Sequence, residues 1–244
     1  MAVIAGIVPE LSVDYPPSPP VFLQRGPSRF AVGVDLAQAN DWTAVSVIEH
    51  KCGVLDRNTE LERHCGIGVH PQVKTEFFDL RHIERVRGVS YVDIVARLKS
   101  LMMTPPLCGD GRTPPAELIV DATGVGRGVA DLISDSGLAF IGVVITGGNV
   151  TTHADGNFWH VSKLDLVSRL DGKLHSGALR IAAALKEAPN LAEELKNFRR
   201  AVSASGRATF GARATAHDDL VLSCALPSWW LGRPPIPRIV VGGY

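Results

Sequence analysis

The sequence predicts an α/β fold with a mixed sheet, in which an antiparallel three-strand meander is joined to parallel strands and flanked by helices. Two observations support this fold class. Apolar runs of strand length come first and are joined by short turns, and later apolar runs alternate with segments of helical periodicity. A third observation links the fold to chemistry, because aspartates stand where several of these elements end or begin.

The meander is predicted from three apolar runs. Residues 30–36 and 42–49 are expected to be strands, and the Gln, Ala, Asn and Asp of residues 38–41 are typical of a hairpin turn. Residues 75–83 are the third candidate strand. Strands joined by short connections are usually antiparallel neighbours, so the three runs should form one meander.

The second half of the chain alternates between helix and strand before it becomes helical. Val92, Val95 and Leu98 recur at helical spacing over residues 91–101, and the prolines that follow stop the helix. The remaining expected elements are a strand at 118–121, a helix at about 126–135, a strand at 139–146, helices at about 162–174, 187–201 and 217–231, and a hairpin around 205–213.

Proline-rich segments mark both ends of the expected folded body. Residues 1–29 contain the run YPPSPP, and residues 232–244 begin with GRPPIP. Proline lacks a backbone N–H and resists helices and inner strands, so both segments are expected to be tails or linkers. A single domain is therefore predicted over residues 30–231.

Composition favours a soluble protein of a reducing compartment. The 244 residues carry a formal net charge of zero, so nucleic-acid binding would need local basic patches. The four cysteines form no CxxC pair, no signal peptide is evident, and no apolar run approaches the roughly 20 residues that span a bilayer. The candidate basic patches, each of which could equally be a solvated face, are Arg81, Arg85 and Arg87, then Lys196, Arg199, Arg200, Arg207 and Arg213.

Three separate elements present an aspartate at one end. Asp35 and Asp121 each end an apolar strand, while Asp218 and Asp219 open the last helix. A right-handed crossover can place the strand at 118–121 beside the first strand, in the same direction, so that two carboxylates become neighbours. Neighbouring carboxylates repel unless a cation lies between them, and an all-oxygen site suits two Mg²⁺ or Mn²⁺ ions about 4 Å apart.

Each aspartate also has a simpler interpretation. Asp218 or Asp219 could cap the last helix, Asp121 could cap the helix that follows it, and Asp35 could be a turn residue. His217 could be a helix-entry residue, or it could orient a carboxylate or contact DNA. The prediction of a metal site depends on the coincidence of the aspartates with the strand order.

Three segments resemble the nuclease domain of tailed-phage terminase large subunits, namely 33–44 (GVDLAQANDWTA), 120–126 (VDATGVG) and 217–223 (HDDLVLS). Segments 78–85, 161–167 and 191–198 are similar to further motifs of that family. The resemblance implies a ribonuclease-H-like fold. It also implies that Asp35, Asp121 and Asp218 bind two Mg²⁺ or Mn²⁺ ions and cut double-stranded DNA, with Asp219 as an accessory ligand.

The resemblance carries further expectations about DNA and partners. Lys163 keeps its place in a family motif and could contact a phosphate or be an ordinary exposed lysine. With Arg199, Arg200 and Arg213 of the basic patches it makes up the candidate DNA-binding residues. No phosphate loop of the GxxxxGK[ST] type occurs, so the chain is expected to be a separately encoded nuclease half or a prophage fragment that cannot translocate DNA alone. The implied partners are double-stranded DNA, a separate terminase ATPase, the small terminase subunit and portal protein, in the cytoplasm of a bacterial host and without a membrane.

Other interpretations remain open or are disfavoured. The function could be that of another ribonuclease-H-like nuclease, such as a junction resolvase, or of a catalytically idle, prophage-derived binding module. Residues 124–128 (GVGRG) do not follow the GxGxxG order, so no nucleotide-binding site is expected. A zinc site is disfavoured because the spacing fits no familiar set for the candidates His50, Cys52, His64, Cys65 and His70.

Overall fold

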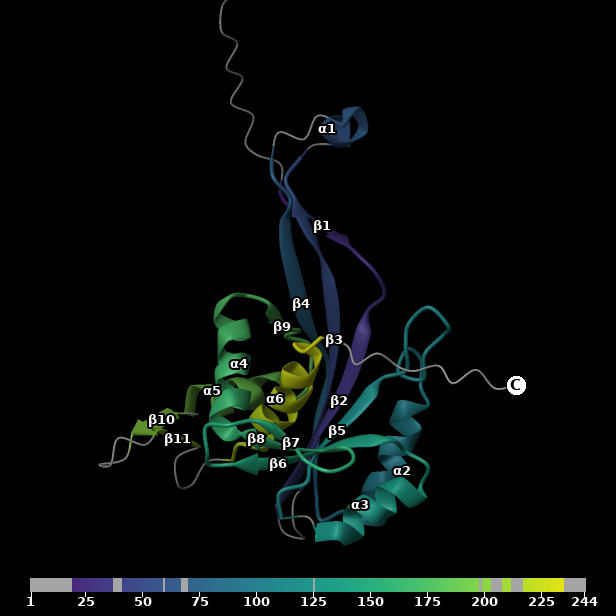
Figure 1. The fold of residues 1–244 in the computed structure, drawn as a ribbon, viewed down its shortest axis with the longest axis vertical. Helices are drawn as coiled ribbons and strands as arrows, with labels where there is room; N and C mark the ends of the chain where they lie inside the picture. Colours follow the sequence, from purple (N-terminus) through teal and green to yellow (C-terminus); the bar gives the residue numbers. More distant parts are fainter. Residues whose placement is uncertain are drawn as a thin grey trace, which may run out of the picture.

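The computed structural model describes residues 19–36, 41–58, 60–66, 70–124, 126–197, 199–202, 208–211 and 217–234. Its centre is a nine-stranded mixed sheet in the order β7-β8-β6-β5-β2-β3-β4-β9, with β1 (Val21–Gln24) paired to β3 (Figure 1). The described sheet therefore starts before residue 30, where the domain was expected to begin. None of the helices in these ranges is long and apolar enough to cross a lipid bilayer.

The predicted meander is confirmed. Strands β2 (Arg29–Asp35), β3 (Trp42–Asp56) and β4 (Val73–Arg87) pair antiparallel in that order. Both β3 and β4 extend beyond the lengths expected from their apolar runs. The extension pairs the ends of β3 and β4 with each other, and the end of β3 also pairs with β1, so backbone hydrogen bonds continue beyond the predicted apolar runs.

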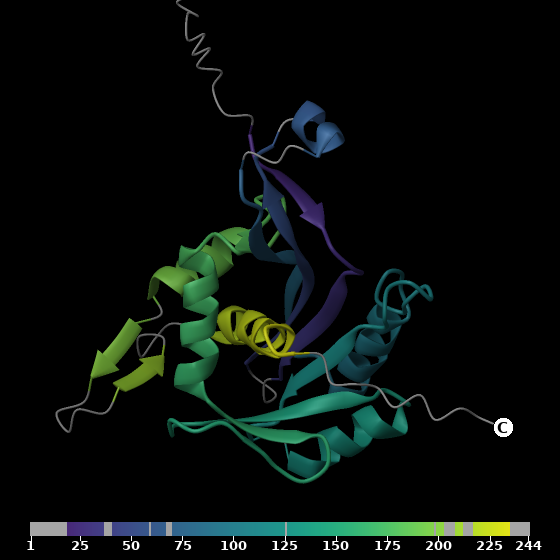
Figure 2. The same ribbon diagram turned by 45° about the horizontal axis from the view of Figure 1, so that its top comes forward.

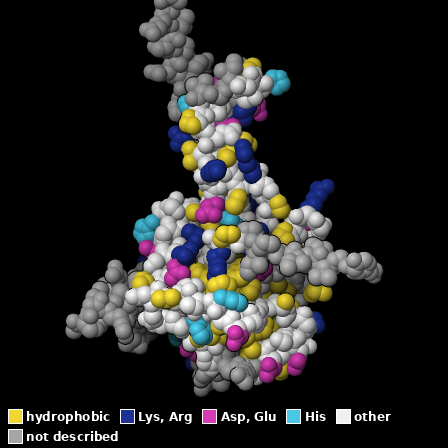
Figure 3. Space-filling model, viewed as in Figure 1, with side chains coloured by type: hydrophobic (Ala, Val, Ile, Leu, Met, Phe, Trp, Pro, Cys, Tyr) yellow, Lys and Arg dark blue, Asp and Glu magenta, His cyan; other side chains and the backbone are white. Residues whose placement is uncertain are grey.

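The extended strands form an arm. The β3–β4 ribbon projects from the body and carries the short helix α1 (Glu60–Cys65) at its tip (Figure 1). In the space-filling view the arm stands clear of the body and presents several Lys and Arg side chains (Figure 3).

The parallel half of the sheet also follows the prediction. Strand β5 (Glu117–Asp121) pairs parallel with β2, and β6 (Phe140–Thr146) pairs parallel with β5. Besides β1, which lies in the expected N-terminal tail, three short strands were not predicted, because runs of two to five residues give little periodicity. They are β7 (Thr152–His153), β8 (Phe158–Ser162) and β9 (Leu179–Ile181), which extend the two edges of the sheet.

Helices cover both faces of the sheet (Figure 2). Val32 and Val34 of β2 belong to the apolar cluster that includes α2 (Tyr91–Met102) and α3 (Gly126–Asp135). The alternate residue Ala31 belongs to the opposite cluster, which includes α4 (Lys163–His175), α5 (Ala188–Asn197) and α6 (Asp219–Leu231). The period-two alternation of β2 therefore supplies both cores.

The helix expected at 187–201 is shorter than predicted. Helix α5 ends at Asn197, and β10 (Arg199–Val202) pairs antiparallel with β11 (Ala208–Gly211). The expected hairpin is present but begins earlier than residue 205. Arg199 and Arg200 are compatible with either a helix or a strand. The sequence pattern therefore did not show that the helix ends at Asn197.

Helix α6 is enclosed by the rest of the protein. Every residue from Asp219 to Leu231 is buried, and the helix lies between the sheet and α4 (Figure 2). Gly33 of β2 makes this close approach of α6 to the sheet possible. A Cβ atom there would lie 2.1 Å from the carbonyl oxygen of Ser223 and 2.3 Å from Cδ of Pro227.

Candidate active site

The ends of β2 and β5 meet at one edge of the sheet. The parallel register pairs Val34 with Val120, so Asp35 and Asp121 follow at the same level of adjacent strands. The strand order predicted from the sequence thus makes these two aspartates neighbours. Asp35 is half-buried, whereas Asp121 is buried.

The charges of four carboxylates act on one another at this edge. Burial holds the pKa of Asp35 well above its ordinary value, and the charges of Asp121, Asp218 and Asp219 raise it further. Lys163 acts in the opposite direction. The structure therefore brings together the four aspartates that the sequence singled out, and their mutual repulsion favours a bound cation.

Asp121 is held by the turn that follows β5. The backbone N–H of Thr123 donates to its Oδ1 at 2.7 Å, and the N–H of Ile145 on β6 donates to Thr123 Oγ at 2.6 Å. Gly124 supplies the positive φ of 79° that this turn needs. Burial raises the pKa of Asp121, while the hydrogen bonds from Thr123 oppose that rise.

Asp218 occupies the N-cap position of α6 but does not act as a cap. Within the described chain its side chain makes no capping hydrogen bond, and its Oδ2 instead accepts from Lys163 Nζ at 2.7 Å. The capping interpretation that is usual for such an aspartate is therefore wrong here. Lys163 begins α4, so this ion pair joins the starts of two helices.

The cap of α6 comes from another helix. Oε2 of Glu194 on α5 accepts the backbone N–H groups of Leu220 at 3.0 Å and Val221 at 3.3 Å. A buried carboxylate at a helix N-terminus satisfies free donors and suits the helix dipole. Glu194 leaves the Asp218 carboxylate free to face the other aspartates.

Arg85 of β4 supports this arrangement. Its Nη1 lies 3.4 Å from Oε1 of Glu194 and 4.0 Å from Oδ2 of Asp219, and its Nε lies 3.3 Å from Glu187. Burial, followed by the charge of Asp219, raises the pKa of Glu194 to about 7. No role for Glu194 was predicted, although its place in segment 191–198 was the signal that could have found it.

Asp219 contains a buried oxygen that a cation could satisfy. Among the described residues, its Oδ2 has no hydrogen-bond partner. Burial raises the pKa of Asp219, and the nearby side chains of Arg85 and His217 oppose that rise. His217 Nδ1 lies 3.9 Å from the other oxygen of Asp219 and 3.5 Å from Asp41, so it remains close to the carboxylates without a close bond to either.

These residues fit a hard divalent cation. Every candidate ligand is a carboxylate oxygen, which suits Mg²⁺ or Mn²⁺ better than a softer metal. The Asp219 oxygen that lacks a hydrogen bond and the repulsion between carboxylates at Asp35 are the features that a bound cation would relieve. Asp35, Asp121, Asp218 and Asp219 are the residues that could hold it.

The candidate DNA-binding residues are placed only in part. Lys163 lies within the carboxylate cluster. The backbone of Arg199 and Arg200 lies in β10, but their side chains are outside the described part of the structure, as is Arg213. Of the expected patch at residues 81–87, Arg85 pairs with acidic residues as described above, and Arg81 pairs with Glu49 at 2.9 Å.

Comparison with known proteins identifies similar chains. The terminase large subunits of Thermus phage G20c and Thermus virus P23-45 are each 28% identical over 144 residues, covering 59% of this chain and 25% of the relative. The chain thus spans about a quarter of the length of these curated relatives. No family model matches the sequence.

Solved structures give a broader match. The large terminase nuclease of phage G20c with bound magnesium superimposes with a TM-score of 0.52 at 21% identity, covering 85% of this chain and 89% of that one. The same nuclease with bound cobalt gives the same TM-score and coverage. The chain has the ribonuclease-H-like fold of large terminase nuclease domains, as the sequence resemblance implied.

Proposed function

We propose that this chain, with the fold of a large terminase nuclease domain, is a metal-dependent endonuclease that cuts double-stranded DNA during phage genome packaging. One observation carries the proposal. Asp35, Asp121, Asp218 and Asp219 come from three separate elements and interact electrostatically at one sheet edge. The similar nuclease with bound magnesium supports the choice of metal.

Asp35, Asp121 and Asp218 are proposed as the ligands of two Mg²⁺ or Mn²⁺ ions, with Asp219 as an accessory ligand. Two divalent ions in such a site would supply an activated water and stabilise the leaving oxygen of a phosphodiester. The protein's own contribution is positioning. The turn at Thr123 fixes Asp121, and Glu194 caps the end of α6 at which Asp218 and Asp219 lie.

Lys163 is proposed to have two roles at the same position. It neutralises Asp218 through the 2.7 Å ion pair. When cations occupy the cluster, its ammonium group is proposed to contact a DNA phosphate, for which Lys is well suited. Arg199 and Arg200 of β10, and Arg213, which lies outside the described residues, are proposed to contact the DNA backbone further away.

The partners follow from the relatives and remain part of the proposal. The matched relatives are terminase large subunits about four times the length of the aligned region. A separate terminase ATPase, the small terminase subunit and portal protein are therefore proposed as partners in the cytoplasm of a bacterial host.

Incubation of the purified chain with plasmid DNA and Mn²⁺ tests the proposal. The wild-type chain should nick and linearise the plasmid, and Asp121→Asn should reduce the rate at least about 100-fold, since it removes a charged ligand and keeps the side-chain volume. Asp135→Asn is the matched control, because Asp135 is exposed on α3. No cleavage by the wild type, or cleavage that survives Asp121→Asn, contradicts the proposal.

The choice of substrate distinguishes the related alternative. Linear duplex, plasmid and four-way-junction DNA should be compared at equal concentrations. Cleavage of duplex and plasmid supports the packaging nuclease, whereas cleavage confined to the junction would indicate a resolvase.

A further inference from the structure

A second group of potential metal ligands lies far from the aspartates. His50 and Cys52 are two residues apart on β3, so their side chains lie on the same face of the ribbon. Cys52 pairs with Glu76 of β4, and His50 pairs with Arg29 at the start of β2. Asp35 is at the other end of β2, which places the two groups roughly 20 Å apart at about 3.4 Å per residue.

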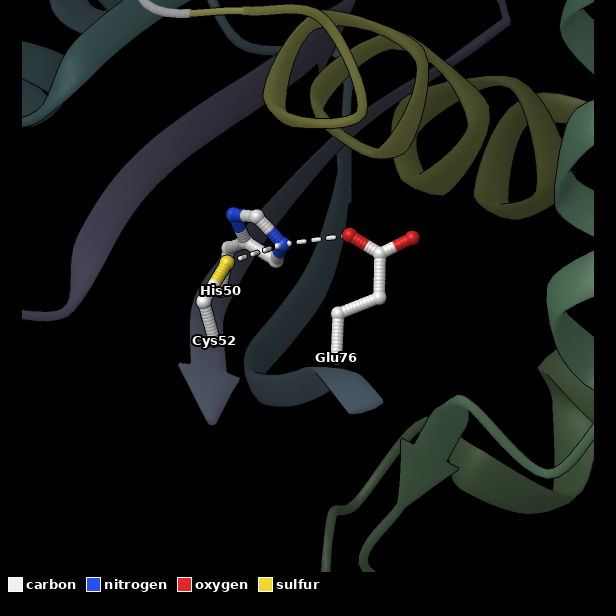
Figure 4. A group of neighbouring side chains, drawn as sticks. All are labelled: His50, Cys52 and Glu76. Carbon is white, nitrogen blue, oxygen red and sulfur yellow. Dashed lines mark hydrogen bonds and ion pairs between the residues drawn. The ribbon is translucent and has the colours of Figure 1, made fainter. Parts of the chain in front are cut away.

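The three side chains converge on one point (Figure 4). His50 Nε2 lies 2.9 Å from Glu76 Oε2 and 3.5 Å from Cys52 Sγ, and the three atoms lie within 4.8 Å of one another. Tetrahedral zinc has bonds of about 2.0–2.3 Å, so its ligand atoms are about 3.3–3.8 Å apart. Shifts of about 1 Å or less would let all three atoms bind one ion.

Local packing prepares the histidine as a ligand. The ring of His50 stacks on Phe78 at a centroid distance of 4.4 Å, and only 7% of its side chain is exposed. Glu76 is 53% exposed and can adjust its position.

The group opens onto a cleft that could admit an ion. The cleft has a volume of about 600 Å³, and its lining includes the three side chains together with Arg29, Pro115 and Arg233. A three-residue ligand set leaves a fourth position, which would face this cleft and take water.

We propose that His50, Cys52 and Glu76 bind one Zn²⁺ ion that joins β3 to β4 at the base of the arm. Sulfur and imidazole ligands select zinc or cobalt over magnesium, unlike the all-oxygen aspartate cluster. The position gives such an ion a structural role. Beyond His50, β2 no longer lies beside β3. On that side β1 takes its place, while β4 continues on the other side.

The spacing of residues along the sequence did not reveal His50, Cys52 and Glu76 as one ligand set. Of the five zinc candidates, His64 and Cys65 lie in or at the end of α1 at the arm tip, and His70 lies nearby at the start of the return to β4. The third ligand of the proposed site is Glu76, which only the cross-strand register brings beside Cys52.

Titration of the reduced, chelator-treated chain with Co²⁺ and Zn²⁺ tests this proposal independently of nuclease activity. Asp121→Asn should serve as the background so that the aspartate cluster is weakened. Co²⁺ should produce a thiolate-to-cobalt charge-transfer absorption, and Zn²⁺ should abolish it. Cys52→Ser should eliminate the absorption, and Glu76→Gln should weaken Zn²⁺ binding at least about tenfold by calorimetry.

Cys108→Ser is the matched control, because Cys108 is also an exposed free cysteine but lies outside the group. It should leave both signals unchanged, and circular dichroism should show that every variant is folded. Absence of the charge-transfer absorption in the background chain would overturn the proposal and leave a simple His50–Glu76 hydrogen bond. Persistence of the absorption in Cys52→Ser would overturn it as well.

Discussion

The hydroxyl of Ser46 on β3 donates a hydrogen bond of 2.7 Å to the backbone carbonyl oxygen of Ser223 in α6. In a regular helix the donor to that carbonyl would be the N–H of residue 227, which here is a proline without an N–H. The strand therefore supplies the donor that the helix lacks. Ser46 and Ser223 are both fully buried, so no solvent could replace this bond.

Ser46→Ala should lower the free energy of unfolding by about 1–3 kcal/mol, because it leaves a buried carbonyl without a donor. Urea denaturation measures this loss. Ser100→Ala, on the exposed side of α2, is the control and should change stability by less than about 0.5 kcal/mol. In a Pro227→Ala background the helix regains its own donor, so the additional cost of Ser46→Ala should shrink. An undiminished cost in that background would contradict this account of the bond.

Gly33→Ala should destabilise the protein by several kcal/mol or prevent folding. The new methyl group would lie 2.1 Å from a backbone oxygen of α6, and backbone cannot yield as a flexible side chain can. Thermal denaturation and expression level measure the effect. Gly172→Ala is the matched control: it has open space in the interior of α4 and should raise stability by up to about 1 kcal/mol. Equal behaviour of the two variants would show that α6 does not need this close approach.

Glu194 should make the stability of the protein fall as pH rises. Its folded pKa of about 7 exceeds the ordinary 4.5, so the folded state binds more protons than the unfolded state between these values. The contribution of Glu194 to the free energy of unfolding is therefore most favourable below pH 4.5. It falls as pH rises to about 7, by a total on the order of 3 kcal/mol. Glu194→Gln keeps the capping oxygen and should remove this dependence.

Denaturation of wild type and Glu194→Gln at several pH values isolates the effect as a difference. The wild type should lose stability relative to the variant between pH 4.5 and 7. A constant difference, or one that changes in the opposite direction, would contradict a raised pKa at this residue.

Mg²⁺ or Mn²⁺ should stabilise the folded chain by binding its aspartate cluster. At a metal concentration of about 100 times the dissociation constant, the gain is about 2.7 kcal/mol, which calorimetry would detect as a higher melting temperature. Burial and mutual repulsion raise the pKa of Asp35, so the effect should grow with pH as the carboxylates lose protons. Asp121→Asn should remove most of the shift, while Asp135→Asn should keep it. An equal shift in both variants would place the metal elsewhere.

Much of the fold could be predicted because its central elements have strong patterns. The alternation along β2 and the helical spacing along α2 each encode which face is buried. The short strand β9 escaped prediction because its three residues become a strand through pairing with β4. The length of the β3–β4 arm was not predicted for a similar reason. Lys51 and Cys52 break the apolar alternation of β3, although its backbone pairing with β4 continues.

The candidate site could be predicted to the level of its aspartates and no further. A carboxylate at the end of a strand is visible in a sequence, as are the residue types that begin a helix. The partner of each group is not visible. Asp218 has the residue type and position of a cap, yet the cap is Glu194 from a separate helix, and Asp218 pairs with Lys163. Such choices depend on packing between elements that are distant in the chain.

The burial of α6 has a consequence for the time at which this protein could become active. Helix α6 follows all the strands and other helices of the described chain, yet it carries Asp218 and Asp219 and fills the space between β2, β3 and α4. A nascent chain that has not yet released this helix from the ribosome lacks half of the carboxylates and a large part of one core. The proposed nuclease would therefore stay inactive until α6 has left the ribosome and packed between β2, β3 and α4.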